Sequence, residues 1–590
     1  MINQNSIAVL PFVNMSNDID NEYFCDGITE EIINALTKVN GLKVIARTSS
    51  FAFKGKGIDI RDIGKQLNVN TILEGSIKKS QDRVRITAQL IAVTDGTHYW
   101  SKRFDRELID IFDLEDEISL AIADEMRNNF GHFEVQNHLI KQPTSSIDAY
   151  QLFLKGRSLQ LQWTPESLNQ AIDFYNQAIA FDKNYAKAYY ANLQCYGLLA
   201  MWGYMPYKEA MNLAIQNLLI AKEIDTSLPE YPLSFVGKFF WEEWDFNNAY
   251  IHINKVLEIN PNHIDGLEAM AELCIALGFF DTALEYANTL LDVDPLSANN
   301  HYTLAHIYYY QSQFEKALET LNYTLTLNPQ LELAHHLKCF CLIWLNRGEE
   351  FEALIQNTSL QAEKRILFQL INDKDIEVPD KMIEKWSLFT EKETMLVPYD
   401  VFILSNSNHK DLAFSHLQNM VSQRRGQIIN YRQEPFIQSL HNIEGFSKLH
   451  ESNLVIEDFK PSQDAEEKQS SSILDSDQVE TLKEELLSYF TEEEPFLNPQ
   501  LSLKFVADVL ELNTNKVSYL INKAFHLNFN DFVNSYRLKH FKSIALDPKN
   551  AHLTILGLAY DSGFNSKSVF NTYFKKIEGL TPRAWLKANA

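Results

Sequence analysis

A repeat of fixed length constrains the middle of this chain more than any other feature. Two residue types recur every 34 residues there: Ala249, Ala283 and Ala317, and Pro261, Pro295 and Pro329. A small residue lets paired helices approach closely, and a proline stops a helix because it lacks the backbone N–H. A helical pair of this size cannot bury its apolar face alone, so the period predicts a stack of pairs that share a continuous core.

Three of these units read NNAYIHINKVLEINP, DTALEYANTLLDVDP and EKALETLNYTLTLNP. A 34-residue period with proline at its end is typical of tetratricopeptide repeats. Looser versions at residues 169–184 and 212–230 extend the array, which we expect to cover residues 145–345. Residues 346–458 stay helical but lose the period. Because EPFIQSLHNIEGFSKLHE resembles the segment often seen after such arrays, we expect degenerate repeats and a cap there.

The first part of the chain alternates strand and helix signals, which predicts an α/β domain over residues 1–135. SIAVLPF and LKVIA are expected as strands, and ITEEIINALTKV and DIRDIGKQLNV as helices. The alternation in RVRITAQLIAV predicts a half-buried strand. The turn TDGT then leads into HYWSKRF, which we expect to be its hairpin partner. The helix IFDLEDEISLAIADEM closes the domain.

Several stretches of this domain resemble the TolB-amino-terminal-like module, which precedes helical repeats in bacterial regulators and some nucleotide cyclases. They are IAVLPFVNMS, EYFCDGITEEII, VIARTSSFAFKGK, ILEGSIKK and VRITAQLI, within residues 5–130. The resemblance implies no ligand. Asp26, Gly27, Glu30 and Arg47 stand at motif positions, and turn geometry or salt links explain them as well as a binding site does.

Charge is distributed very unevenly along the chain. Residues 501–590 contain 12 Lys+Arg and 6 Asp+Glu, a net formal charge of +6. Because the whole chain has a net formal charge of −25, residues 1–500 have a net formal charge of −31. Only the basic part is suited to contact phosphates. Residues 459–478 are polar, Ser-rich and acidic, which predicts a flexible linker between the acidic body and this basic region.

Two short helix pairs form the C-terminal region, which we delimit as residues 479–590 with a leading helix. In LSLKFVADVLELNTNKVSYLINKAF the second helix is expected to begin at Asn513 or Thr514, both good N-caps. In LTILGLAYDSGFNSKSVFNTYFKK the first helix ends at Tyr560 and the second restarts at Asn565, with Gly563 in a left-handed position. Two helices joined by a short turn form the helix-turn-helix arrangement.

The second helix of such a pair docks in the major groove with its N-terminal residues at base edges. Short polar residues occupy these positions, and the candidate base contacts are Thr514, Asn515, Lys516, Ser518, Tyr519, Ser566, Lys567, Ser568, Asn571 and Thr572. Nearby basic residues are candidate phosphate contacts: Arg537, Lys539, Lys542, Lys575, Lys576 and Arg583. Apolar residues at helical spacing are expected in the core: Val517, Leu520, Ile521, Val569, Phe570, Tyr573 and Phe574.

Together with the linking helix NDFVNSYRLKHFKSIAL, the two pairs resemble the AraC family of transcription regulators over residues 495–587. The resemblance implies two helix-turn-helix subdomains joined by one long helix. Both recognition helices would then lie on one face, about one DNA turn (~34 Å) apart. Many family members place Arg in the second recognition helix, whereas this chain has Asn571 and Thr572, so the resemblance does not imply which bases it prefers.

Motifs for other chemistry are absent from the sequence. It has no phosphate-binding Walker loop, no HExxH and no Gly-x-Ser-x-Gly, so we expect no enzymatic activity and no cofactor. Five scattered cysteines fit a reducing compartment, and Cys339 and Cys341 are expected to be buried helix residues and not metal ligands. No signal peptide and no apolar run of about 20 residues is found, which favours a cytoplasmic protein that does not span the membrane.

These observations predict a multidomain bacterial transcription regulator that binds double-stranded promoter DNA through its C-terminal region. Its α/β domain and repeats would receive a signal, either a small-molecule effector or a protein partner, and a homodimer is compatible with this organisation. First-helix positions of the repeats would line a peptide groove: Tyr231, Lys238, Trp241, Glu268, Glu272, Tyr302 and His306. A structural spacer or a dimerisation surface explains the repeats equally well. The alternative function is an interaction scaffold whose repeats assemble other proteins, with DNA attachment secondary.

Overall fold

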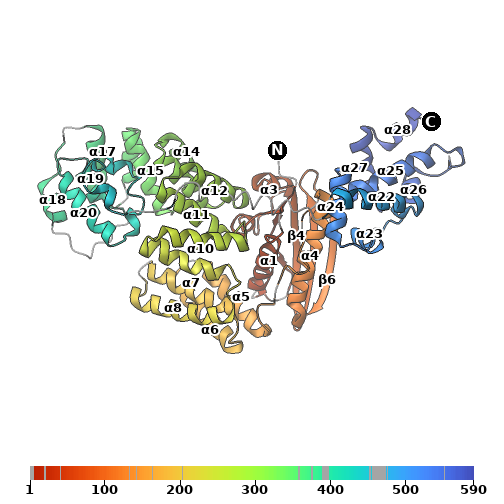
Figure 1. Ribbon diagram of the computed structural model, residues 1–590, viewed down its shortest axis with the longest axis horizontal. Helices are drawn as coiled ribbons and strands as arrows, with labels where there is room; N and C mark the ends of the chain where they lie inside the picture. Colours follow the sequence, from red (N-terminus) through yellow and green to blue (C-terminus); the bar gives the residue numbers. More distant parts are fainter. Residues whose placement is uncertain are drawn as a thin grey trace.

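The computed structural model places an α/β domain between two helical regions (Figure 1). The repeats lie on one side of this domain, and the C-terminal helices extend as an arm on the other. The structure describes residues 5–589 except 17, 19–20, 40, 132, 134, 141, 163, 202–203, 357–358, 374–375, 388–396, 451–453, 455–473, 475 and 551. Most of the predicted linker therefore lies outside the described residues. Within the described part, no helix combines the length and apolar character needed to cross a bilayer.

The α/β domain is built on one mixed sheet. Its strands are β1 (Ser6–Val9), β2 (Val13–Asn14), β3 (Lys43–Val44), β4 (Thr71–Ser80), β5 (Arg83–Ala92) and β6 (His98–Glu107). Its helices are α1 (Glu22–Leu36), α2 (Arg47–Phe51), α3 (Ile60–Leu67) and α4 (Ile111–Phe130), with the 3-10 turn η2 (Leu108–Asp110) before α4. The strand order is β3-β1-β4-β5-β6, with β2 also paired to β4. The predicted α/β fold is confirmed.

Sequence alternation accounts for the antiparallel half of this sheet. Val84, Ile86 and Ala88 of β5 are buried between exposed or half-buried neighbours, as the pattern predicts. β5 pairs with β6 in the predicted hairpin, and on its other side with β4. The parallel half, in which β1 lies between β3 and β4, needs the connections through α1 and α3 to bring the strands together.

The repeat region consists of antiparallel helix pairs. The helices are α5 (Ile147–Gln160), α6 (Pro165–Phe181), α7 (Ala186–Met201), α8 (Tyr207–Ile224), α9 (Glu230–Val236), the π-helix η3 (Gly237–Glu243), α10 (Phe246–Ile259), α11 (Ile264–Leu277), α12 (Phe280–Val293), α13 (Ala298–Tyr310), α14 (Phe314–Leu327) and α15 (Glu332–Trp344). Ala249, Ala283 and Ala317 are fully buried where paired helices meet, so the 34-residue period has the predicted structural basis. Cys339 and Cys341 are buried in α15, also as predicted.

After α15 the helices become shorter and wrap back over the end of the array. They are α16 (Gly348–Ile355), α17 (Gln361–Asn372), α18 (Asp380–Ser387), α19 (Tyr399–Ser405), α20 (Lys410–Ser422) and the 3-10 turns η4 (Gly426–Ile428), η5 (Pro435–Leu440) and η6 (Phe446–Lys448). These elements share one apolar core with the last repeats. Phe436 of η5, for example, stacks on Trp344 of α15 with ring centroids 5.0 Å apart.

Two of the α/β motif residues hold the α/β domain to the first repeat. A Cβ atom on Gly27 would lie 2.6 Å from the Leu154 side chain of α5, so the glycine allows α1 and α5 to approach closely. Glu30 of α1 accepts hydrogen bonds from Arg157 of α5 at 2.9 and 3.1 Å, and its carboxylate lies 3.2 Å from Arg47. Burial opposes ionisation, but the two arginines hold the pKa of Glu30 below its ordinary value. These residues act in domain packing.

A second junction joins α2 to the middle of the array. The Asp294 carboxylate, in the turn between α12 and α13, accepts hydrogen bonds from the backbone N–H of Ser49 at 3.0 Å and from its hydroxyl at 2.5 Å. The Ser49 hydroxyl oxygen in turn accepts from the Leu296 N–H at 2.8 Å. The α/β domain therefore packs against the repeats at two places that are far apart in the sequence.

Candidate DNA-binding interface

The C-terminal arm contains the two predicted helix pairs. Its elements are α22 (Ser476–Glu492), η8 (Pro495–Leu497), α23 (Leu503–Val509), α24 (Thr514–Phe525), α25 (Phe529–Ala545), η9 (Pro548–Asn550), α26 (Ile555–Asp561), α27 (Lys567–Glu578) and α28 (Pro582–Asn589). α23 and α24 form the first unit, and α26 and α27 form the second. α25 joins the two units, as the resemblance to the AraC family implied.

Side-chain caps fix where α24 and α27 begin. The Asn513 side chain accepts from the Lys516 N–H at 2.8 Å at the start of α24. The Ser566 side chain accepts from the Val569 N–H at 3.2 Å at the start of α27. Such caps satisfy backbone donors that the first helical turn leaves free. α24 begins at Thr514 as predicted, and α27 begins at Lys567, two residues after the predicted restart at Asn565.

Gly563 shapes the turn of the second unit. Its φ of +86° lies in the left-handed region, as predicted. A Cβ atom at this position would lie 2.1 Å from the carbonyl oxygen of Phe496 and 2.9 Å from the Cα of Leu497. The turn between α26 and α27 thus packs directly on the backbone of η8, and only a residue without a side chain fits.

Each unit has its own apolar core. Leu486 and Phe490 of α22 join Val517, Leu520 and Ile521 of α24 in the first. The second core is formed by residues of α25 to α28: Leu538, Phe541, Leu558, Ala559, Phe564, Phe570, Tyr573, Phe574 and Trp585. The core prediction holds for six of its seven residues. It is wrong for Val569, which is 36% exposed because it lies on the N-terminal face of α27.

The structure separates the candidate base contacts into accessible and inaccessible ones. Lys567 and Thr572 of α27 are exposed. Six other candidates are partly buried: Ser566 and Asn571 in α27 and its cap, and Thr514, Asn515, Lys516 and Tyr519 in α24. Ser518 is 7% exposed, so the structure contradicts its selection as a base contact. Its position turns toward the core between Val517 and Leu520. The side chain of Ser568 lies outside the described residues.

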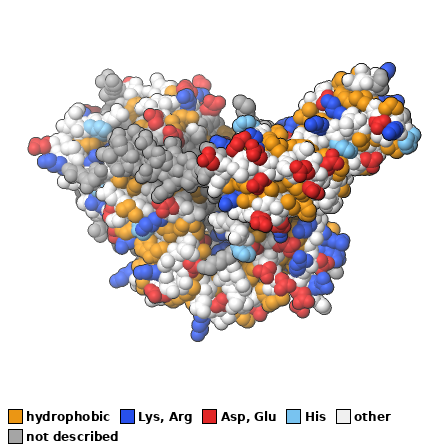
Figure 2. All heavy atoms as spheres, turned by 45° about the vertical axis from the view of Figure 1, so that its right-hand side comes forward, with side chains coloured by type: hydrophobic (Ala, Val, Ile, Leu, Met, Phe, Trp, Pro, Cys, Tyr) orange, Lys and Arg blue, Asp and Glu red, His pale blue; other side chains and the backbone are white. Residues whose placement is uncertain are grey.

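The candidate phosphate contacts also divide. Lys539, Lys575 and Arg583 are exposed. Lys542 is paired with Glu578 at 3.0 Å, and Lys576 with Asp531 at 2.8 Å, so each already has an anionic partner. Figure 2 shows Lys and Arg side chains on the arm interspersed with Asp, Glu and His, and not gathered into one continuous patch.

Arg537 corrects the sequence interpretation. It is 7% exposed, and its guanidinium donates to the carbonyl oxygens of Phe496 at 2.8 Å and Asn498 at 2.9 Å. Burial lowers the pKa of Arg537 to about 10. The side chain holds the turn before α23 against α25 and is not free for phosphate. Counting charge in the sequence could not distinguish this buried arginine from surface ones.

The predicted peptide groove of the repeats is only partly open. Glu268 and Glu272 of α11 and Tyr302 and His306 of α13 are partly buried, and α11 and α13 pack side by side. Tyr231 packs farther back in the array, against the cluster around Tyr190. Near Trp241, the 3-10 turn η4 covers part of the predicted groove, since a Cβ atom on Gly426 would lie 3.3 Å from the Trp241 ring. Lys238 is exposed and lies 3.4 Å from Glu243.

The part of this face formed by α11 and α13 is acidic and aromatic, and its side chains are partly buried. Burial raises the pKa of Glu272 to about 8, and Glu268 adds to this. Burial, Asp265 and Asp294 raise the pKa of Glu268 to about 7. The imidazole of His306 lies between the rings of Tyr302 and Tyr310, with centroids 5.3 and 4.6 Å away, and burial lowers its pKa to about 4. This face therefore presents two carboxyl groups beside aromatic rings.

Raised carboxyl pKa values make the stability of the array fall as pH rises. An unfolded glutamate releases its proton near pH 4.5, whereas folded Glu268, Glu272 and Glu434 hold theirs up to about pH 7 to 8. The folded state therefore binds more protons between these limits, and the free energy of unfolding decreases across them. Below about pH 6.5 histidines with lowered pKa, such as His306, act in the opposite direction. We therefore expect the melting temperature of the repeats to fall from pH 6.5 to pH 8, and Glu272→Gln to reduce that fall.

Differential scanning calorimetry of the full chain across this pH range measures the effect. Glu319→Gln, an exposed change of equal charge in α14, is the matched control and should leave the slope as it is. If the melting temperature of the Glu272→Gln variant changes with pH as steeply as that of the control, the raised pKa of Glu272 is not a cause of the fall.

A pocket of about 460 Å³ lies in the α/β domain beyond the carboxyl end of β1. Its lining combines apolar and polar side chains: Leu10, Pro11, Val13, Phe53, Lys54, Gly55, Lys56, Ile58, Ile60, Ile63, Glu74, Gly75, Ser76, Thr87 and Gln89. This is the point where the connections of a doubly wound sheet diverge to opposite faces, and small molecules bind there in many α/β proteins.

Three family models match separate parts of the chain. A helix-turn-helix domain model matches residues 506–588. A model of the second domain of HilA/YgeH-like transcriptional regulators matches residues 3–120. The model of anaphase-promoting complex, cyclosome, subunit 3 matches residues 277–358.

Curated relatives match part of the chain. A putative adenylate cyclase 3 of Rhizobium meliloti is 42% identical over 186 residues, which is 31% of this chain and 31% of the relative. Transcriptional regulator HilA of Salmonella typhimurium is 31% identical over 86 residues, 15% of this chain and 16% of that protein. The chain thus spans about a third of the first relative's length and about a sixth of the second's.

Solved structures show similarity at low identity. YrrB, a tetratricopeptide repeat protein with an unusual peptide-binding site, is 22% identical, with a TM-score of 0.22 over 32% of this chain and 92% of its own. Human IFIT1 is 13% identical, with a TM-score of 0.31 over 57% of this chain and 77% of its own. The chain carries a HilA-like regulator region, tetratricopeptide-type repeats and an AraC-type helix-turn-helix region, in that order.

Proposed function

We propose that this protein regulates transcription by binding promoter DNA through α24 and α27 in adjacent major-groove segments. The observation that carries this proposal is the pair of complete, capped helix-turn-helix units joined by the single helix α25. The net charge of +6 over residues 501–590 supports it, because this region can meet phosphates while the rest of the chain is strongly acidic.

The N-terminal residues of α27 are suited to direct base reading. Lys567 can donate to guanine, Asn571 can pair with adenine, and exposed Val569 can contact a thymine methyl group. Lys539, Lys575 and Arg583 are the exposed candidates for phosphate contact. α27 contains no arginine, so guanine recognition in this unit rests on lysine.

The α/β domain and the repeats would receive the signal. The acidic, aromatic face of α11 and α13 supports a protein or peptide partner with basic side chains, since its two carboxyl groups have raised pKa values that a nearby cation would lower. A small-molecule effector would fit the pocket beyond β1. The same repeat face favours the second candidate function, a scaffold that assembles other proteins on DNA.

We propose no catalytic role for the chain. One relative is named a putative adenylate cyclase, but the similarity covers 31% of its length, and the models that match here describe a regulator domain, repeats and a helix-turn-helix domain.

Replacing Lys567 with alanine is expected to weaken promoter binding about tenfold to a hundredfold, because one base or phosphate contact contributes ~1–3 kcal/mol. Fluorescence anisotropy with fragments of the protein's own upstream DNA measures this effect at several salt concentrations. A base contact predicts relaxed sequence preference at one position. A phosphate contact instead predicts uniformly weaker binding and a salt slope smaller by about 1.

Lys410→Ala, an exposed change of the same charge in α20, is the control and should bind like the parent. The fragment of residues 476–590, which contains both arm cores except Leu474, is measured beside the full chain. No salt-sensitive, sequence-preferring binding in either form would refute a regulator that reads DNA.

A further inference from the structure

The first recognition helix is already engaged by the α/β domain. The Asn515 side chain, near the N-terminus of α24, donates through Nδ2 to the carbonyl oxygen of Val135 at 3.2 Å. Its Oδ1 accepts from the Val135 N–H at 3.4 Å and from the guanidinium of Arg127 in α4. Arg127 is 3% exposed and is also paired with Asp124 at 2.6 Å.

These contacts use the edge of Asn515 that would read DNA. An asparagine amide recognises adenine by donating to N7 and accepting from the N6 amino group. The Val135 backbone offers Asn515 the same combination of one acceptor and one donor. Asn515 cannot satisfy both partners at once, so the α/β domain and an adenine compete for it.

Further contacts hold the first unit in this place. The Asn528 side chain, which caps α25, donates to the Asn129 carbonyl at 2.8 Å, and the Asn530 side chain donates to Asn129 Oδ1 at 3.0 Å. α25 packs against α4. We call Arg127, Asn129 and Val135 the docking surface. A duplex that admitted α24 into its major groove would have to displace this surface, since the groove is only about 12 Å wide.

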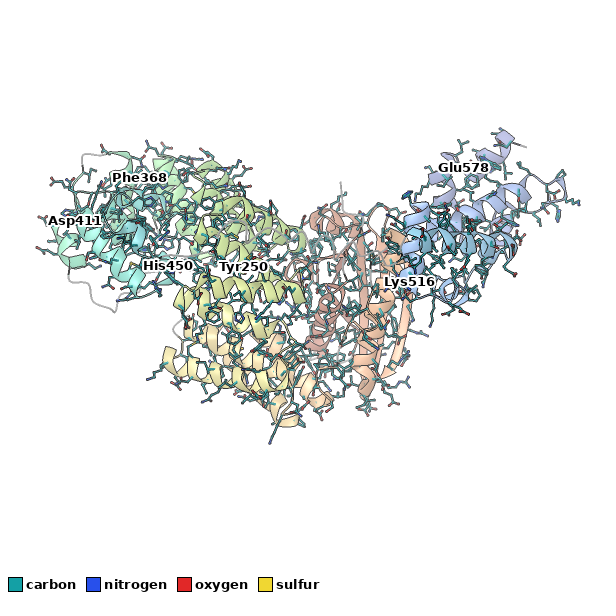
Figure 3. All side chains as sticks on the ribbon, viewed as in Figure 1. Tyr250, Phe368, Asp411, His450, Lys516 and Glu578 are labelled. Atoms are coloured by element: carbon teal, nitrogen blue, oxygen red, sulfur yellow. The ribbon has the colours of Figure 1, made fainter. Side chains whose placement is uncertain are left out.

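The second unit has no such partner among the described residues. Figure 3 shows Lys516 of α24 where the arm meets the α/β domain, whereas Glu578 of α27 lies far out on the arm. Lys567, Thr572 and Lys575 of α27 are exposed. The structure therefore presents one recognition helix to solvent while the other is held.

We propose that the α/β domain inhibits DNA binding by occupying the first recognition helix, and that promoter binding through both helices requires release of the docking surface. This inference rests on the proposed function and adds its regulation. Affinity through both helices is then reduced by the fraction of molecules that are open.

The connection behind Val135 shows how a signal could reach this contact. The residues after Val135 fold back on α4, where Asp116 accepts from the N–H groups of Leu139 and Ile140 at 2.7 and 2.9 Å. The ammonium of Lys38, just after the end of α1, donates to the Leu139 carbonyl at 2.7 Å. The chain then enters α5, the first helix of the repeats. A change in how α5 packs on α1 would therefore act on the segment that holds Asn515.

Two full-chain variants test the proposal from opposite sides of the contact. Arg127→Ala removes the guanidinium that binds Asn515, and Asn530→Ala removes the arm's bond to Asn129. Neither residue is assigned to DNA. Both variants should bind promoter DNA more tightly, Arg127→Ala by tenfold or more, while Lys410→Ala binds like the parent. Hydrogen exchange without DNA should rise in residues 513–530 of both variants.

The outcomes separate the two claims. Increased hydrogen exchange with unchanged promoter affinity in both variants would overturn the proposed inhibition by the α/β domain, but not the proposed function in transcription. Unchanged hydrogen exchange in both variants would show that the contact between the arm and the docking surface does not form in solution. That result would also overturn the proposed inhibition. Absence of DNA binding in the parent, in both variants and in the 476–590 fragment would overturn the proposed function together with its regulation. Circular dichroism checks that each variant is folded, and Asn530→Ala keeps the test valid if Arg127→Ala unfolds.

Discussion

An Arg537→Ala variant is expected to lose about 3 kcal/mol of stability in the DNA-binding arm. The guanidinium donates two hydrogen bonds to backbone carbonyls, and bonds to charged groups contribute ~1.5–3 kcal/mol each. Its removal leaves the Phe496 carbonyl without this donor at a site where water has little access. The variant should also bind DNA poorly, but because its fold is weakened and not because a phosphate contact is lost.

Lys539→Ala is the matched control on the same helix. Lys539 is exposed and lies only two residues along α25, so its replacement should leave the melting temperature unchanged and weaken DNA binding modestly. Thermal unfolding of the 476–590 fragment, followed by circular dichroism, measures both variants. An Arg537→Ala fragment that melts like the parent but has lost salt-sensitive DNA affinity would restore the phosphate role first expected for Arg537.

The contrast between these two residues shows what the sequence could predict. The 34-residue period, the alternation of β5 and the cap of α24 are patterns within short stretches of sequence, and the corresponding elements form as expected. Arg537 and Lys539 both appear as basic residues on a helix. Only the packing of η8 against α25 determines that one guanidinium is buried under two carbonyls while its neighbour faces solvent.

Contacts between distant segments were beyond sequence reasoning. Asn515 lies at the start of α24, as the sequence predicts, but its bonds to Val135 join positions about 380 residues apart. No periodicity or composition reports such a pairing. The same holds for Glu30 and Arg157, whose ion pair explains a motif residue that could equally have belonged to a binding site. The DNA sequence that α27 prefers stays a prediction.

Gly563→Ala is expected to destabilise the second helix-turn-helix unit by about 2–5 kcal/mol. An alanine in the left-handed region costs ~1–2 kcal/mol, and forcing extra atoms into a packed site costs ~1–3 kcal/mol more. The obstruction is rigid, because the new Cβ would lie 2.1 Å from the Phe496 carbonyl oxygen, a backbone atom. α26 and η8 must separate to admit it, so DNA binding through α27 should be lost as well.

Gly579→Ala distinguishes these two contributions. Gly579 also has a positive φ, +69°, but nothing lies within 4 Å of where its Cβ would be. Its replacement should therefore cost only the backbone term, about 1–2 kcal/mol. Equal losses in the two variants, measured by chemical unfolding of the 476–590 fragment, would show that the contact with η8 is absent.

A double variant connects the two predictions. The carbonyl that Gly563→Ala would displace is the one that accepts from Arg537 at 2.8 Å. If Gly563→Ala moves that carbonyl, its hydrogen bond to Arg537 is already broken. Arg537→Ala then removes a smaller stabilising contribution. The double variant should therefore lose less stability than the sum of the two single-variant losses, by roughly 1 kcal/mol or more. Gly579→Ala with Arg537→Ala should instead be additive, since those sites share no partner. Full additivity in the Gly563 pair would mean that η8 does not couple α25 to the turn before α27.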